Sequence, residues 1–87
     1  MRWTWYVYIL ECIDGSYYTG MTRQPDQRWT QHLSGFGSKY TERHPAKSVV
    51  YLEEYEDLEE ARSREQQIKG WVRAKKERLI RGEWGKL

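Results

Sequence analysis

The distribution of apolar and polar positions along the chain predicts three strands. Residues 5–12 (WYVYILEC) are apolar on both faces, which is typical of the central strand of a sheet. Asp14 and Gly15 give a hairpin signal, and residues 16–21 are predicted to form the returning strand. Residues 48–55 (SVVYLEEY) have the β-branched and aromatic composition of a third strand.

The first predicted helix follows the hairpin. Pro25 suits the first turn of a helix, and Asp26 would lie near its positive end. We expect this helix to run to about Ser34. Residues 34–45 (SGFGSKYTERHP) contain two glycines and are predicted to form a loop.

Two further helices are predicted after the third strand. Asp57, with Glu60 three residues later, resembles a capping box and predicts a helix over residues 58–69, before Gly70. Residues 73–81 are predicted to form the last helix.

The predicted order is therefore β-β-α-β-α-α. It describes a small α/β domain of the α+β kind, with a three-stranded, mainly antiparallel sheet flanked by three helices. We expect one domain over residues 3–81 and a short tail over residues 82–87, since 87 residues are enough for a single domain.

The first predicted helix carries two polar residues of chemical interest. Trp29 and Leu33 are four residues apart and are expected to form its buried stripe, whereas Arg28 and His32 share a neighbouring face. An arginine and a histidine at the edge of an apolar face suit phosphate contact and proton transfer. An ordinary solvated pair is the alternative.

The second predicted helix carries a carboxylate on its inward side. Glu65 falls in the same narrow sector as four apolar residues, which are Leu58, Ala61, Ile68 and Val72. An inward carboxylate is unfavourable unless it is paired or bound to a cation. Glu65 is therefore a candidate metal ligand or a member of a buried ion pair.

The hairpin allows two registers, and they differ in where two tyrosines point. A two-residue turn at Asp14 and Gly15 would place Tyr8 and Tyr18 on opposite faces of the sheet. A three-residue loop over residues 13–15 would pair Tyr8 with Gly20 and place both hydroxyls on one face. We expect the second register, in which Gly20 leaves space beside Tyr8.

Composition narrows the class of protein. The single cysteine, Cys12, excludes an intramolecular disulfide and a multi-cysteine zinc site, and it suits a reducing compartment. The N-terminal apolar run is short and lacks a small-residue cleavage site, so it is interpreted as a strand and not as a signal peptide. No stretch has the roughly 18 apolar residues of a membrane span, and we expect a cytoplasmic protein without a membrane partner.

Charge is unevenly distributed along the chain. The net charge is only +2, but residues 48–67 carry −5 and residues 68–87 carry +5. A basic C-terminal segment can be the electrostatic footprint of nucleic acid. The alternative is a solvated helix face that balances the acidic segment before it.

The ordered set of motifs resembles the GIY-YIG nuclease superfamily, and in particular its small stand-alone bacterial members. The residues that carry the resemblance are YVY at 6–8, YTG at 18–20, RWTQH at 28–32 and the inward Glu65. The longer phrases YILECIDGSYYTGMT, GSKYT, EARSRE and IKGW extend it over residues 5 to about 80. Tyr6 stands where the family name has glycine, and the chain contains no asparagine, although many members use one after the glutamate.

The resemblance implies an endonuclease that hydrolyses DNA phosphodiester bonds with Mg²⁺ or Mn²⁺, with a role in DNA repair or recombination. By position it implies that Tyr8, Tyr18, Arg28, His32 and Glu65 are catalytic, and that Glu65 holds the metal. A single carboxylate can suffice, because Mg²⁺ keeps several waters and binds substrate phosphate oxygens. Either tyrosine could take a proton from the attacking water, with His32 as the relay.

Other residues are expected to hold the DNA backbone. They are Lys39 and Arg43 in the glycine-containing loop, where Tyr40 is available for stacking, and Lys69, Arg73, Lys75 and Lys76 after the helix that carries Glu65. His44, before Pro45, is interpreted as an exposed loop residue. The alternative function is a DNA-binding module whose catalysis is weak or depends on a protein partner.

Overall fold

The computed structural model describes residues 4–35 and 37–82. The observed elements are β1 (Trp5–Cys12), β2 (Tyr17–Thr22), α1 (Pro25–Leu33), α2 (Lys39–Arg43), β3 (Ala46–Tyr55), α3 (Leu58–Lys69) and α4 (Arg73–Ile80). The predicted α+β class and element order are confirmed, with one short helix added. Residue 3 of the predicted domain and residues 83–87 of the predicted tail lie outside the described residues.

The added helix, α2, lies in the segment that was predicted to be a loop. Ser38 precedes it in extended conformation, and its side chain accepts a hydrogen bond from the backbone N–H of Thr41. This is the usual way in which a serine begins a helix. The loop prediction was therefore wrong over Lys39–Arg43. The two nearby glycines favour a loop, whereas Ser38 caps a short helix after them.

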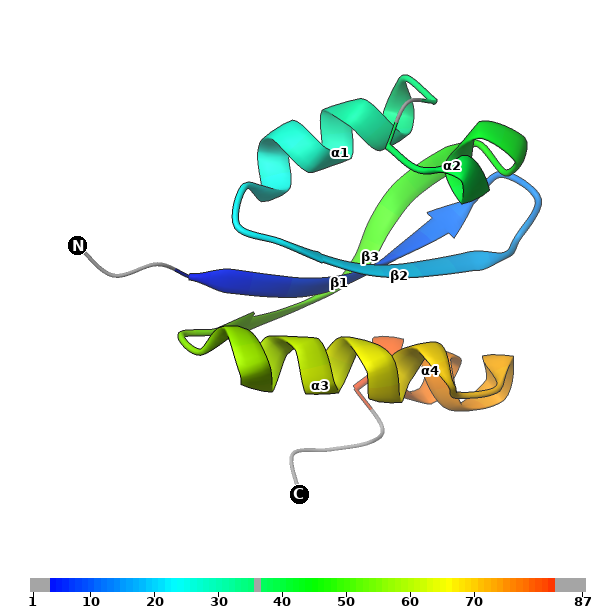
Figure 1. Cartoon of the computed structure of the whole chain (residues 1–87). Coiled ribbons are helices and arrows are strands. Elements are labelled where there is room, and N and C mark those ends of the chain that lie inside the picture. The colour runs from blue at the N-terminus through cyan, green and yellow to red at the C-terminus, as the bar shows by residue number, and fades with distance from the viewer. Residues whose placement is uncertain (1–3, 36, 83–87) are drawn as a thin grey trace.

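The sheet separates two helical layers. Its strand order is β2-β1-β3, both pairings are antiparallel, and β1 is central as predicted. Figure 1 shows α1 and α2 on one face and α3 and α4 on the other. Because side chains alternate along a strand, Val7 and Ile9 pack toward α3, whereas Tyr8 and Leu10 pack toward α1.

The hairpin has the three-residue register that the sequence favoured. The backbone N–H of Cys12 donates to the Ser16 carbonyl at 2.8 Å, and Gly15 has a φ of 86°. Leu10 consequently pairs with Tyr18, and Tyr8 pairs with Gly20. The prediction that both tyrosines share one face of the sheet is confirmed.

Two predicted core positions are wrong. Leu33 is 63% exposed and Val72 is 71% exposed. Leu33 is the last residue of α1, and α1 turns His32 toward the sheet in its place, with 1% of that residue exposed. Val72 lies beyond the end of α3 and begins α4, so the 100° periodicity no longer applies to it.

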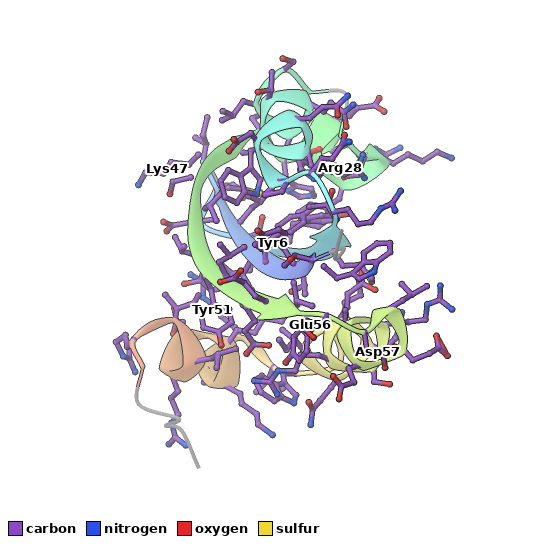
Figure 2. The ribbon with its side chains drawn as sticks, turned by 90° about the vertical axis from the view of Figure 1, so that its left-hand side faces the viewer. Tyr6, Arg28, Lys47, Tyr51, Glu56 and Asp57 are labelled. Atoms are coloured by element: carbon purple, nitrogen blue, oxygen red, sulfur yellow. The ribbon has the colours of Figure 1, made fainter. Side chains whose placement is uncertain are left out.

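A buried polar cluster joins β3 to α3 on the other face. The Glu53 carboxylate accepts hydrogen bonds from Arg64 Nη2 at 2.9 Å and from the Tyr55 hydroxyl at 2.7 Å, and also from the Tyr51 hydroxyl. Burial alone would raise the pKa of Glu53, but these hydrogen bonds bring it below its ordinary value. Figure 2 shows Tyr51 directed from the curved sheet toward this helical layer.

We predict that Arg64→Met lowers the free energy of unfolding by about 2–3 kcal/mol, because it leaves the Glu53 carboxylate without its cation. The decrease should be smaller than for a completely buried pair, since the two side chains remain 24% and 16% exposed. The double variant Arg64→Met, Glu53→Gln should lose less than the single one. Urea denaturation at neutral pH measures both, and a larger loss in the double variant would contradict the pairing argument.

Candidate functional site

Tyr8 belongs to β1, and its side chain extends over Gly20 in the neighbouring edge strand β2. A Cβ atom built on Gly20 would stand 2.6 Å from the Tyr8 hydroxyl oxygen and 3.1 Å from Cε2 of Tyr18. Real Cβ atoms do not approach other atoms at the first distance, so the site requires glycine here. A glycine stands within this strand because the Tyr8 hydroxyl occupies the space that a side chain would need.

The Tyr8 hydroxyl is connected to a chain of buried hydrogen bonds. It lies 2.9 Å from Nε2 of His32, and Nδ1 of His32 lies 3.0 Å from the hydroxyl of Thr41. The Thr41 hydroxyl in turn donates to the Ser38 carbonyl at 3.3 Å. Since a hydroxyl has one proton, we assign the Nδ1–H tautomer to His32, so Nε2 accepts the proton of Tyr8.

The protein environment keeps both members of this pair neutral at pH 7. Burial is the main cause that lowers the pKa of His32 to about 4, and the positive charge of Arg28 is the second cause. Burial raises the pKa of Tyr8 to about 12, with Tyr18 and Glu65 adding to the shift and Arg28 opposing it. A neutral imidazole acceptor therefore faces a neutral phenol donor.

A second glycine makes room for the histidine ring. A Cβ atom at Gly37 would collide with Nδ1 and Cγ of His32. The segment between α1 and α2 therefore closes over His32 at a glycine, just before Ser38 and Thr41 supply its polar partners. The tight contact fixes the ring in the plane that serves both hydrogen bonds.

Arg28 lies one turn before His32 and is less buried. It projects from the α1 layer (Figure 2) and donates from Nη1 to the Gln31 side chain at 3.1 Å. The charge of Arg28 opposes the rise that burial causes in the pKa of Tyr8, so the guanidinium lies near that phenol. Arg28 also lines an open depression with β2 residues Met21 and Thr22. The arrangement gives one cation access both to solvent and to the Tyr8–His32 pair.

Glu65 reaches the same edge of the sheet from the opposite helical layer. Helix α3 packs against β2 and β1, and the Glu65 side chain is only 13% exposed. Lys69, one turn later, pairs with it at 3.4 Å from Nζ to Oε2. The negative charge of Glu65 makes a small contribution to the raised pKa of Tyr8.

The donor set at Glu65 suits a hard cation. Within residues 4–35 and 37–82, no three His, Cys, Asp or Glu side chains gather as a metal-binding group. A single carboxylate is compatible with Mg²⁺ or Mn²⁺, because such an ion keeps several waters and binds phosphate oxygens. Glu65 would hold the ion, and the Lys69 ammonium would have to leave its carboxylate.

The structure divides the six expected DNA-binding residues into two groups. Lys39 and Arg43 are exposed on α2, and neither forms an ion pair in the described part of the chain. In the other group, Lys69 pairs with Glu65, and Arg73 pairs with Glu77 and donates to the carbonyl of Gly15. Lys75 lies 4.4 Å from the centre of the Trp71 ring, and burial lowers the pKa of Lys76.

Four residues of this region are not identified by the sequence pattern. The pattern predicts a loop at Gly37 and Ser38, gives no role to Thr41, and predicts an exposed loop residue at His44. His44 instead lies at the C-cap of α2, donates from Nδ1–H to Asp14 Oδ2 at 2.6 Å, and stacks on Tyr40. A serine three residues before a threonine, in the phrase GSKYT, was the available signal for the capped helix.

We predict that Gly20→Ala lowers the free energy of unfolding by about 1–3 kcal/mol, because the new methyl group forces Tyr8 out of its rotamer and away from His32. Gly70→Ala is the matched control, since the nearest atom to a Cβ there lies 3.6 Å away and the backbone has a φ of −82°. Thermal or urea unfolding of both variants checks the result. Equal stability of the two would contradict the close contact at Gly20.

The buried neutral His32 predicts that the fold loses stability in mild acid. An unfolded histidine has a pKa of about 6.5, whereas the pKa of His32 is lowered to about 4, so the unfolded chain binds the proton first. The free energy of unfolding should fall by about 2–4 kcal/mol as pH decreases from about 6.5 to about 4. His32→Gln should flatten this part of a urea-denaturation profile, and an equally steep profile would refute the assignment.

Known proteins resemble the chain over nearly its whole length. Residues 4–78 match the GIY-YIG catalytic domain family. The chain is 41% identical over 80 residues to a UPF0213 protein of Natronomonas pharaonis, covering 92% of this chain and 94% of that protein. It is 45% identical over 76 residues to a UPF0213 protein of Staphylococcus aureus, covering 87% and 93%.

Solved structures agree with the fold. The solution NMR structure of a UPF0213 protein from Bacillus halodurans has 46% identity and a TM-score of 0.58, over 88% of this chain and 82% of that one. The solution NMR structure of a protein from E. faecalis has 37% identity and a TM-score of 0.62, over 93% and 88%. The resemblance found in the motifs is thereby confirmed. The chain belongs to the GIY-YIG family of catalytic domains, which are nuclease domains.

Proposed function

We propose that this domain is an endonuclease that hydrolyses DNA phosphodiester bonds with Mg²⁺ or Mn²⁺ held at Glu65. The observation that carries the proposal is the convergence of four groups at one sheet edge. A neutral Tyr8–His32 pair, the Arg28 cation and the Glu65 carboxylate come from three elements, and the charges of Arg28 and Glu65 both act on the pKa of Tyr8. General base, phosphate-binding cation and metal ligand are the groups that phosphodiester hydrolysis needs.

The proton path follows the observed hydrogen bonds. The attacking water gives its proton to the Tyr8 oxygen as the Tyr8 proton passes to Nε2 of His32, while Thr41 holds the Nδ1–H. Tyr8 has no exposed surface, and the partly exposed Tyr18 lines the approach to it. A bound phosphate near His32 would raise the pKa of the imidazole and favour this transfer, since an opposite charge stabilises imidazolium.

The substrate charge is neutralised from two sides. Arg28 stabilises the negative charge that develops on the scissile phosphate. When bound at Glu65, the metal ion supplies Lewis acidity at the phosphoryl oxygen and at the leaving oxygen. The exposed Lys39 and Arg43 on α2 are the better-placed cations for the flanking backbone, and Lys69, Arg73, Lys75 and Lys76 form a second candidate set.

We place this activity in the cytoplasm, because the single cysteine of the chain, the buried Cys12, suits a reducing compartment. A role in DNA repair or recombination is part of the proposal and follows from the family resemblance. No helix in the described ranges has the length and apolar character needed to cross a membrane. The alternative, a DNA-binding module with partner-dependent catalysis, is favoured by the ion pair between Glu65 and Lys69, which a metal would have to open.

We predict that Glu65→Gln lowers metal-dependent cleavage of DNA by about 100-fold or more, the order expected when a group that stabilises transition-state charge is lost. Fold and most DNA affinity should persist, because the variant keeps the size of the side chain. Glu59→Gln is the matched control, since Glu59 lies on the exposed side of α3. Cleavage is measured on linear, flapped and branched DNA with Mg²⁺ and with EDTA.

Two outcomes separate the alternatives. Cleavage by Glu65→Gln at the wild-type rate would show that Glu65 is structural and that any metal is held elsewhere. Metal-dependent DNA binding by the wild-type protein without cleavage of any of these substrates would favour the partner-dependent module.

A further inference from the structure

A row of aromatic rings leads from the buried pair to the surface of α2. The Tyr18 ring centre lies 6.4 Å from that of Tyr8 and 5.7 Å from that of Tyr40. His44 then stacks on Tyr40, with ring centres 4.3 Å apart and planes 22° from parallel. The rings come from β1, β2 and α2 with its C-cap, and they form one connected series beginning at the proposed catalytic centre.

The outer end of this row is held in place and is partly open. The His44 side chain is 37% exposed, and its Nδ1 lies 2.6 Å from the Asp14 carboxylate in the hairpin loop. Tyr40 covers one face of the imidazole and Asp14 occupies one nitrogen. We expect one more flat ring to stack on the part of the imidazole that stays exposed.

The surroundings of His44 suit a nucleotide. A hollow of about 650 Å³ is lined by Lys39, Tyr40, Glu42, Arg43 and His44. Lys39 and Arg43 are exposed and have no ion-pair partner in the described part of the chain, in contrast to Arg73 of α4, which pairs with Glu77. Aromatic rings interleaved with available cations are the combination that binds single-stranded nucleic acid.

We propose that this α2 surface, defined by Tyr40, His44, Lys39 and Arg43, binds an unpaired nucleotide of DNA next to the scissile phosphate. The inference rests on the proposed function. The base extends the stack of His44 on Tyr40, and the adjoining phosphates lie against Lys39 and Arg43. Bases within a continuous duplex have both faces covered by neighbouring bases, so only an overhang, flap or branch offers a free face.

DNA binding without cleavage tests this inference. Fluorescence anisotropy in Ca²⁺ compares a blunt duplex with the same duplex carrying a short single-stranded overhang. The wild-type protein should bind the overhang DNA about 5- to 100-fold more tightly, the range expected for stacking one base. His44→Ala should lose this preference, whereas His44→Phe should keep it, because both break the Asp14 contact and only the second retains a ring.

The cations are tested by salt dependence. Lys39→Ala, Arg43→Ala should weaken binding of both DNAs and reduce the salt slope by up to about two, since each neutralised phosphate contributes about −0.9. Lys75→Ala, Lys76→Ala removes the same charge from α4 and is the matched control. A larger decrease in the control would place the DNA backbone on α4 and overturn the assignment to α2.

The inference fails if the wild-type protein binds the two DNAs equally, or if His44→Phe loses the preference as completely as His44→Ala. Its failure is distinguishable from failure of the proposed function, which is judged by cleavage in Mg²⁺. Cleavage with no overhang preference would defeat the stacking site alone. Overhang preference with no cleavage would defeat the endonuclease assignment alone.

Discussion

The hydrogen bond between Tyr8 and His32 is the constraint on which this fold and its site depend. It joins the central strand to α1 through two polar groups that are almost completely buried. Leaving either group without its partner would expose the other to the full penalty of an unsatisfied polar atom in the interior. The neighbouring backbone accommodates this bond, with Gly20 giving space to the phenol and Gly37 giving space to the imidazole.

The arrangement of the layer formed by α1 and α2 depends on that pair. Thr41 has to present its hydroxyl to His32, so α2 has to be helical and correctly placed. Ser38 begins that helix by capping it, and its carbonyl accepts the hydrogen bond that the Thr41 hydroxyl donates. The hairpin loop meets α2 through Asp14 and His44. A structural requirement inside the core thus positions the surface helix that carries Lys39 and Arg43.

The strands, the three main helices and the register of the hairpin could be predicted because local rules determine them. A three-residue loop needs a residue with positive φ, and Gly15 supplies it, which in turn pairs Tyr8 with Gly20. Asp57 caps α3 by a bond within three residues. Each of these outcomes depends on neighbours in sequence, so the pattern alone contains the information.

The burial of His32 in place of Leu33 could not be predicted in this way. Periodicity counts a histidine as polar, and its partners Tyr8 and Thr41 are 24 and 9 residues away. The same applies to His44, whose environment is made by the hairpin loop 30 residues earlier. Helical spacing identified Glu65 as inward-facing, but which strands it lies against depends on the packing of α3 on β2 and β1.

The complete burial of Tyr8 has a kinetic consequence. A water molecule cannot touch an oxygen atom that has no exposed surface, so the resting arrangement is a closed one. The proposed chemistry then requires a transient opening beside the Tyr8 hydroxyl, where Gly20 contributes no side chain. Conformational opening of an enzyme site takes microseconds to milliseconds. In many enzymes this step, and not bond breaking, sets the turnover rate. In this small domain, the opening that exposes Tyr8 would then limit the turnover rate.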